Sequence, residues 1–328
     1  MTYQESLKKF ELLFDHKMND EQMRDFLIGL RLNESTNVDT IAAAAHVMKA
    51  HSLCLPVQEE LKEKIIDIVG TGGDKIGSFN ISSTVALLVA SAGAYVAKHG
   101  SRSVTSKSGS ADMFEKLGVR LDLSIDNSAR LLEETGFTFM FAQNYHPAMK
   151  FIMPIRKSIP DKTIFNILGP LTNPAGVKKT LLGVFDKSFV KKLADALKMN
   201  GSSDAMVVSS KERMDEISIS DITYAARLKN GSIEEFVIDP LTYGIKRVPL
   251  SAIMGGDGEE NAKILTNIFD NRATDAQRDI VLINAAAAFV VEGMARDLQD
   301  GIDIAKEALL SDRAKVKLQQ IIEVSSKL

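Results

Sequence analysis

Two polar, glycine-containing segments, each directly after a short apolar run, limit what this 328-residue chain can fold into. The first, residues 70–74, follows the β-branched run 65–69, and the second, residues 98–106, follows the apolar residues 95–97. Because one helix-length stretch separates them, the order strand, loop, helix, strand, loop predicts a βαβ crossover. The two strands are then parallel, and both loops lie at the carboxyl edge of a sheet, where open α/β folds bind ligands.

The residue types in these segments predict a phosphorylated ligand. Glycine amides and short hydroxyls suit phosphate oxygens. The second segment adds Arg102, which suits bidentate contact, and Lys98, which like the nearby Lys107 suits point-charge contact. A tight turn that requires positive φ is the alternative interpretation of residues 70–74. Three glycines in four residues after a buried strand favour the phosphate cradle.

Neither common nucleotide-binding motif is present in the two loops. The dinucleotide pattern counted from Gly70 ends on Lys75 instead of glycine. A Walker A motif needs glycine directly before Lys-Ser, and Ser106 stands at that position. The ligand is therefore expected to be a polyphosphate of another kind.

The hydrophobic pattern predicts an α/β protein with a helical start. Residues 1–63 show helical periodicity and fit three or four short helices. A further helix opens near residue 79 with Asn80 or Ser82 as its N-cap. Prolines 154, 160, 170 and 174 predict connecting segments or a hinge. Strands are expected at 65–69, 95–98, 137–141, 180–185 and 204–209, with β segments at 219–238 and 243–248, and helices at 260–271, 275–292 and 301–327.

Composition excludes several classes of protein. The net charge of −3 argues against broad nucleic-acid binding, which needs a basic surplus. The single cysteine, Cys54, excludes an intrachain disulfide and a cysteine-based zinc site. The N-terminus is polar and unlike a signal peptide, and the longest apolar run, 84–97, is shorter than the ~20 residues that cross a bilayer. We expect a cytoplasmic protein with no membrane or nucleic-acid partner.

Asp215 and Glu216 form an acidic pair just past the predicted strand 204–209. Such a pair alone is usually a solvated surface feature. If a diphosphate is the ligand, Mg²⁺ is expected, and carboxylates bind Mg²⁺ together with substrate oxygens. His99 and His146 are isolated, and no His-x-x-x-His spacing indicates zinc.

A series of ordered sequence blocks resembles the anthranilate phosphoribosyltransferases over essentially the whole chain. The blocks are DIVGTGGD (67–74), FNIS (79–82), KHG (98–100), RSV (102–104), SKSGSAD (106–112), HPAMK (146–150), FNILGPLTNP (165–174), DEIS (215–218) and GGD (255–257). The resemblance implies an α/β fold with a small N-terminal helical domain and a larger domain with a mainly parallel central sheet. The active site then lies in the cleft between them. The implied helical domain is residues 1–63, joined by a helical segment near 160–178. The implied α/β domain is residues 64–159 and 179–328.

The resemblance also implies the activity and its partners. The enzyme transfers the phosphoribosyl group of 5-phosphoribosyl-1-diphosphate to the amine of anthranilate and releases diphosphate, the second step from chorismate to tryptophan. Mg²⁺ is the implied cofactor. A homodimer through the helical domains is implied, and a glutamine amidotransferase is a possible partner.

The same resemblance implies a set of site residues. The implied catalytic residues are Lys98, Arg102, Asp215 and Glu216, and the implied metal ligands are Ser82, Asp215 and Glu216. Anthranilate is expected near Gly70, His99, Ser101, His146, Arg156 and Pro170. Phosphoribosyl diphosphate is expected at Gly70, Gly73, Asp74, Ser78, Asn80, Ile81, Ser82, Ser83, Lys98, His99, Gly100, Ser101, Arg102, Ser103, Val104, Thr105, Ser106 and Ser110.

The chain departs from the family pattern at three places. Ser101 replaces an asparagine that touches the aromatic acid in relatives, so acceptor affinity is the property most open to change. Ser78 replaces threonine and keeps the hydroxyl, and Arg213-Met214 replace Gly-Leu before the acidic pair.

Two alternatives share this kind of fold. A pyrimidine-nucleoside phosphorylase would carry a Lys-His-Ser-Thr-Gly-Gly order that is absent here. A non-catalytic relative that binds nucleic acid would be basic and would lose the acidic pair, which this chain keeps.

Overall fold

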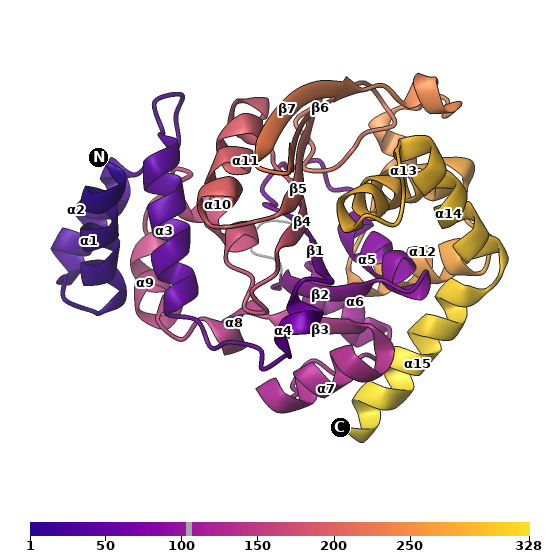
Figure 1. The fold of residues 1–328 in the computed structure, drawn as a ribbon, viewed down its shortest axis with the longest axis horizontal. Coiled ribbons are helices and arrows are strands. Elements are labelled where there is room, and N and C mark those ends of the chain that lie inside the picture. The colour runs from indigo at the N-terminus through magenta and orange to yellow at the C-terminus, as the bar shows by residue number, and fades with distance from the viewer. Residues whose placement is uncertain (103–106) are drawn as a thin grey trace.

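The computed structural model describes residues 1–102 and 107–328 and has a seven-stranded sheet at its centre, in the order β3-β2-β1-β4-β5-β6-β7 (Figure 1). Neighbouring strands from β3 to β5 are parallel, whereas β6 and β7 are antiparallel. This confirms the predicted α/β class and the βαβ crossover. The strands are β1 Ile65–Gly70, β2 Tyr95–Gly100, β3 Phe137–Phe141, β4 Lys179–Gly183, β5 Asp204–Ser210, β6 Thr223–Lys229 and β7 Ser232–Ile238.

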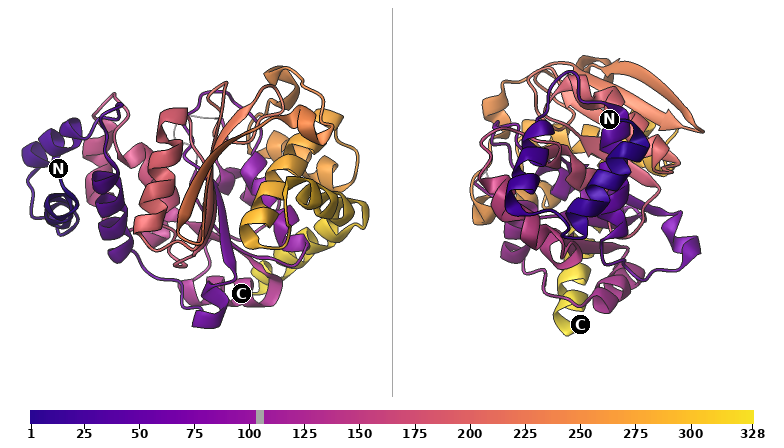
Figure 2. Two further views of the ribbon diagram at one scale, coloured as in Figure 1. Left: turned by 45° about the horizontal axis from the view of Figure 1, so that its top comes forward. Right: turned by 90° about the vertical axis from the view of Figure 1, so that its left-hand side faces the viewer.

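The N-terminal region is helical, as predicted, and lies at one end of the molecule (Figure 2). The helices at this end are α1 Tyr3–Phe14, α2 Asp20–Gly29 and α3 Val38–Ala50. The short α4 Glu59–Lys62 lies away from them, beside the sheet (Figure 1). Thr2 and Asn19 cap α1 and α2 in reciprocal capping boxes, which satisfy backbone amides that lack helical partners. Buried residues of α1, α2 and α3 share a core with α11 (Val190–Met199), which covers β5 and β6.

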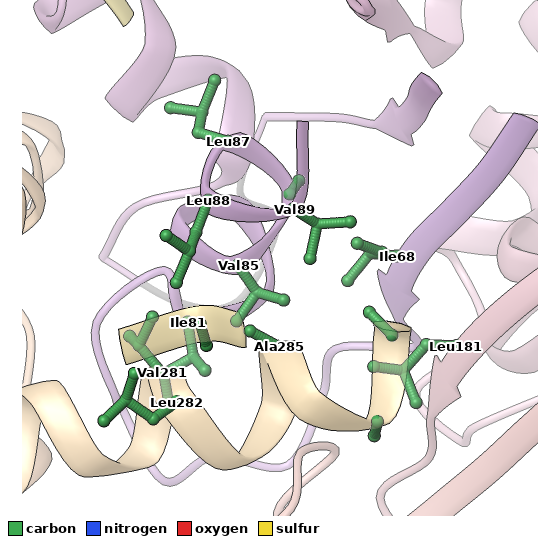
Figure 3. Packing of buried hydrophobic residues seen from close by; sticks show 14 of the residues in the cluster. Ile68, Ile81, Val85, Leu87, Leu88, Val89, Leu181, Val281, Leu282 and Ala285 are labelled. Atoms are coloured by element: carbon green, nitrogen blue, oxygen red, sulfur yellow. The ribbon is translucent and has the colours of Figure 1, made fainter. Parts of the chain in front are cut away.

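The other face of the sheet is covered by α5 (Ile81–Ser91) and α13 (Asp275–Glu292). Figure 3 shows Val85 and Val89 of α5 near Ala285 of α13 and near Ile68 and Leu181 of the sheet. The small residues of α5 and α13 allow the two helices to pack closely. Behind them lie α14 Leu298–Leu310 and α15 Arg313–Lys327, with α12 Gly258–Phe269 and α6 Ser110–Lys116 on the same side. Helix α7 Ile125–Thr135 packs against β3 and α15, and its Ala129 and Leu132 belong to a separate small core with Ile65, Ala97 and Met140.

Three local predictions differ from the structure. Residues 243–248 form no strand: a 3₁₀ turn at Pro240–Tyr243 leads into Gly244 with φ +72°, and this segment pairs with none of the seven strands in the described part of the chain. Pro154 lies inside α9 (Met149–Lys157) instead of in a connection, since a helix tolerates proline by giving up one backbone hydrogen bond. The predicted C-terminal helix 301–327 is interrupted at Asp312, which has φ +58°.

The segment between β3 and β4 brings several short helices against the N-terminal ones. These are α8 Ala142–Tyr145, α9, α10 Phe165–Leu168 and the 3₁₀ turn Gly169–Leu171, and α9 packs against α2. Among the described residues, no helix combines the length and hydropathy needed to cross a membrane.

Candidate active site at the carboxyl edge of the sheet

Three strands end in glycine at the edge where the predicted loops meet. A Cβ atom on Gly70, at the end of β1, would overlap the Asp215 Oδ2 atom. A Cβ atom on Gly183, at the end of β4, would overlap the Asp215 backbone oxygen. At the end of β2, a Cβ atom on Gly100 would overlap the Ser110 Oγ atom. Close approach of other groups therefore excludes side chains at all three positions.

Residues 70–74, here called the glycine loop, are held against the acidic pair. Gly72 and Gly73 have φ values of +66° and +74°, the left-handed region that favours glycine. The Gly72 amide donates to the Asp215 Oδ2 atom at 2.6 Å, and the Ser82 amide at the start of α5 donates to the Glu216 Oε1 atom at 3.0 Å. Residues 70–74 therefore form a turn with positive φ, and this same turn lies against the acidic pair.

Lys98 from β2 lies in the same cluster. Its Nζ atom donates to the Ile68 carbonyl at 2.6 Å and to the Ser82 hydroxyl at 3.2 Å. Burial lowers the pKa of Lys98, while the charge of Asp67 acts to raise it. One amine and one hydroxyl are thereby fixed beside the acidic pair.

The cluster contains more carboxylates than cationic groups. Burial and the charge of Asp74 raise the pKa of Asp215 to about 7. Burial and the charge of Asp215 raise the pKa of Glu216 well above its usual value. Crowded carboxylates hold protons in this way unless a cation neutralises them.

The donor set fits Mg²⁺ that is shared with a substrate. Ser82, Asp215 and Glu216 offer oxygen ligands at one place, and burial together with the neighbouring carboxylate raises the pKa of both acids. Within residues 1–102 and 107–328, no group of three or more His, Cys, Asp or Glu side chains is placed to hold a metal ion alone. Mg²⁺ commonly binds through one or two carboxylates, with phosphate oxygens and water completing its shell.

A buried polar network behind Lys98 was not predicted as part of the site. The Asn173 Nδ2 atom donates to the Asp67 Oδ2 atom at 2.7 Å and to the Ala97 carbonyl at 2.8 Å. Burial raises the pKa of Asp67 to about 6, against the opposing charge of Lys98. The sequence does contain a sign of this network, because Asp67 is a single carboxylate in the middle of the β-branched run 65–69.

Other predicted phosphate-binding residues surround the start of α5. Ser78 pairs with Met254 in an isolated bridge, and Asp74 accepts a hydrogen bond from the Ile76 amide at 3.1 Å. Asn80 occupies the N-cap position of α5, but its side-chain oxygen accepts from the side-chain amide of Asn261 at 2.8 Å instead of capping the helix. Ile81 and Ser83 are buried in α5, so their side chains face the core.

Arg102, just after β2, is held by carboxylates. Arg102 donates to Asp112 at 2.9 Å and to Glu115 at 2.7 Å, and these partners raise its pKa. The Ser110 hydroxyl donates to the Ser101 carbonyl at 3.4 Å. Of the remaining predictions in the second loop, Ser103, Val104, Thr105 and Ser106 lie outside the described residues.

Two of the predicted acceptor residues, His99 and His146, lie side by side. The rings of His99 and His146 lie 5.0 Å apart, and the His99 Nδ1 atom lies 3.3 Å from the carbonyl of Gly169, next to Pro170. Burial lowers the pKa of His99 to about 3 and that of His146 to about 4, so both are neutral at pH 7. The Arg156 guanidinium lies 6.0 Å from the centre of the Phe165 ring, in the short helix that precedes Gly169 and Pro170.

Sequence comparisons relate the chain to enzymes of one activity. A family model described as glycosyl transferase family, a/b domain, matches residues 62–315. The chain is 43% identical over 328 residues to the anthranilate phosphoribosyltransferase of Xanthobacter autotrophicus, covering 100% of this chain and 94% of that protein. It is 45% identical over 317 residues to the enzyme of Rhizobium meliloti, covering 97% and 92% of the two chains.

Solved structures with the same fold carry the same name. The enzyme from Thermus thermophilus matches with a TM-score of 0.91 at 33% identity, over 99% of this chain and 96% of that one. The enzyme from Saccharomyces cerevisiae in complex with phosphoribosyl diphosphate and Mg matches with a TM-score of 0.87 at 27% identity, over 99% and 93%. The yeast enzyme in complex with 4-fluoroanthranilate gives 0.84 at 26% identity, over 99% and 92%.

Proposed function

Because the chain belongs to the anthranilate phosphoribosyltransferase family, we propose that the carboxyl edge of its sheet carries out this family's reaction with the residues gathered there. The enzyme transfers the phosphoribosyl group of 5-phosphoribosyl-1-diphosphate to the amine of anthranilate. The products are N-(5-phosphoribosyl)anthranilate and diphosphate, and the reaction belongs to tryptophan biosynthesis.

The convergence of the glycine loop with Asp215 and Glu216 is the observation that carries this proposal. The glycine loop would offer backbone amides such as that of Asp74 to the diphosphate, and the Lys98 amine lies close to the acidic pair. Departure of diphosphate builds negative charge on the leaving oxygens, which preorganised donors stabilise. Mg²⁺ is the cofactor, held by Ser82, Asp215 and Glu216, and when bound it neutralises part of this leaving-group charge.

No strong base is needed on the acceptor side. The aromatic amine of anthranilate is neutral at pH 7 and nucleophilic, so positioning accounts for much of the catalysis. Arg156 would hold the acceptor carboxylate by a bidentate contact, and the neutral His99 and His146 with Pro170 would line its path. Ser101 stands where relatives use asparagine and would set acceptor affinity.

Arg102 would change partners on binding. Its guanidinium is held by Asp112 and Glu115 beside the second loop. Contact with the substrate phosphate would require it to exchange a carboxylate for a phosphate oxygen, two groups of similar geometry.

A diphosphate-release assay tests this function. The purified protein with Mg²⁺ and phosphoribosyl diphosphate is expected to release diphosphate only when anthranilate is added. Release without anthranilate would indicate a hydrolase. Phosphate-dependent cleavage of a pyrimidine nucleoside would favour the phosphorylase alternative, and binding of nucleic acid with no turnover would favour the non-catalytic one.

The organisation of the molecule is also a proposal. Residues 1–63 would form a helical domain, joined near residues 160–178, and residues 64–159 and 179–328 would form the α/β domain.

The exposed Leu12 of α1 and Phe151 of α9 support a homodimer through the helical side. A cytoplasmic location fits the single free cysteine, Cys54, and a glutamine amidotransferase would be its protein partner.

A further inference from the structure

We infer that Lys162 is a positioning residue that holds the glycine loop in the shape that receives diphosphate, an inference that rests on the proposed function. Its Nζ atom donates to the Gly73 carbonyl at 2.7 Å. The same atom lies 3.3 Å from the centre of the Phe185 ring, which follows β4. A half-buried ammonium fixed by a carbonyl and an aromatic face has little freedom to move.

The contact at Gly73 sets the direction of one peptide group. A trans peptide is planar, with its C=O and N–H pointing to opposite sides. With the Gly73 carbonyl directed at Lys162, the Asp74 amide points away from Lys162. Among the described residues this amide donates to no protein acceptor, which leaves it available to an anionic ligand.

The glycine loop is held from two sides by opposite charges. Asp215 accepts from the Gly72 amide at 2.6 Å, and Lys162 donates to the Gly73 carbonyl at 2.7 Å. Gly72 and Gly73 both have positive φ and no neighbouring strand partner, so side-chain anchors define their peptide planes. Loss of either anchor is expected to loosen the loop.

Lys162 also connects the helical region to this loop. Its backbone carbonyl accepts from the Leu32 amide at 2.9 Å, and the neighbouring Thr163 forms an isolated bridge with Arg31. Residues 30–32 follow α2, so one residue joins the helical side by its backbone and the substrate loop by its side chain. The position of the helical region is thereby linked to the shape of the glycine loop.

The electrostatic surroundings agree with a role near a polyanion. Burial, with the charges of Arg213 and Lys75, lowers the pKa of Lys162. On its other side lies a cavity of about 820 Å³ that is lined by Phe185, Phe189 and Phe236, among others. The Lys162 side chain thus forms part of the wall between this cavity and the glycine loop.

The experiment compares Lys162→Met, which keeps length and packing on Phe185, with Lys162→Arg, which keeps the charge. Lys162→Met is expected to raise the KM for phosphoribosyl diphosphate about tenfold, the effect of losing one charge-assisted hydrogen bond, with the anthranilate KM nearly unchanged. Lys162→Arg is expected to restore most of the affinity. Lys187→Met is the matched control, because Lys187 lines the same cavity but lies over the Tyr224 ring at 4.9 Å.

Several outcomes would overturn the inference. An unchanged KM for phosphoribosyl diphosphate in Lys162→Met would do so, as would an equal rise of both KM values. An effect of the same size in Lys187→Met would indicate general electrostatics instead of a specific contact. Failure of the proposed function is distinguished from these results, since the wild-type protein would then release no diphosphate with anthranilate.

Discussion

At the scale of single residues, the site depends on positions where no side chain fits. Gly70→Ala would place a Cβ atom on top of the Asp215 Oδ2 atom, so the carboxylate has to move. A displacement on the order of 1 Å in such a site lowers turnover about 100-fold. Steady-state kinetics with an Mg²⁺ titration measure this, and we expect kcat to fall together with metal affinity.

Gly29→Ala is the control for that substitution. Gly29 ends α2, and a Cβ atom at this position would meet no other atom within 4 Å. Activity is expected to match the wild type, since Ala in place of Gly at a compatible site changes stability by only about 0.4–1 kcal/mol. Normal activity of Gly70→Ala would show that Asp215 is not held where the geometry requires it.

The acidic pair predicts a pH dependence for metal binding. The pKa of Asp215 is raised to about 7, and its deprotonated form is the one that binds metal. Protons therefore compete with Mg²⁺ below pH 7, and the apparent Mg²⁺ affinity is expected to rise about tenfold from pH 6 to pH 8. Diphosphate release measured against Mg²⁺ concentration at each pH gives this slope.

Asp215→Asn supplies the comparison at each pH. This variant has no proton to lose at the position, so Mg²⁺ affinity is expected to be weak and to vary less across the same range. The substrate phosphates also titrate in this range, but they affect both proteins alike. Subtracting the slope of the variant from that of the wild type removes their contribution. Equal slopes in the two proteins would contradict the assignment of Asp215 to the metal.

At the scale of elements, Asn173 ties β1 and β2 to the segment that precedes β4. Asn173→Ala removes three hydrogen bonds, two that its side chain donates and one that it accepts from the Ala175 amide, and leaves the buried Asp67 carboxylate without one of its donors. Unpairing a charged buried group costs about 2–3 kcal/mol. Urea unfolding is expected to show this loss in the free energy of unfolding.

The matched substitution is Asn127→Ala. The Asn127 side chain donates to the Leu328 carbonyl at the chain terminus, a contact that joins no strands. We expect a loss below about 1 kcal/mol. If both variants lose the same stability, the network around Asp67 contributes no more than a peripheral hydrogen bond.

Local sequence patterns were sufficient for elements whose partners follow closely in the chain. β1, α5 and β2 form one crossover, and their apolar runs and glycine endings predicted it. Residues 243–248 have the composition of a strand, but strand formation needs a neighbouring edge, which a single sequence does not reveal. Lys162 has no local signal, because its role depends on a residue 89 positions away. Arg102 was predicted as a phosphate ligand from its residue type, whereas its pairing with Glu115 depends on the direction of α6.

At the scale of the whole molecule, the helical end carries two exposed apolar side chains on neighbouring elements. Leu12 of α1 is 44% exposed and Phe151 of α9 is 57% exposed, and the Phe151 ring contacts His16 just past α1 at 4.1 Å. Exposed apolar side chains that lie on one face of a molecule are candidates for an interface. A dimer through this face would bury both side chains and would leave the carboxyl edge of the sheet open to substrate.

Replacing both residues with lysine tests this interface. A lysine cannot be buried unpaired at the centre of an interface, so the double variant Leu12→Lys, Phe151→Lys is expected to sediment as a monomer at concentrations where the wild type is dimeric. Leu310→Lys is the control, since Leu310 is 75% exposed on α14 at the opposite end of the molecule (Figure 1). If the control dissociates and the double variant does not, the dimer forms through the other end. A monomeric wild type would remove the interface altogether. Because neither substitution touches the glycine loop or the acidic pair, the isolated double-variant subunit is expected to retain diphosphate release, which would show that each chain contains a complete site.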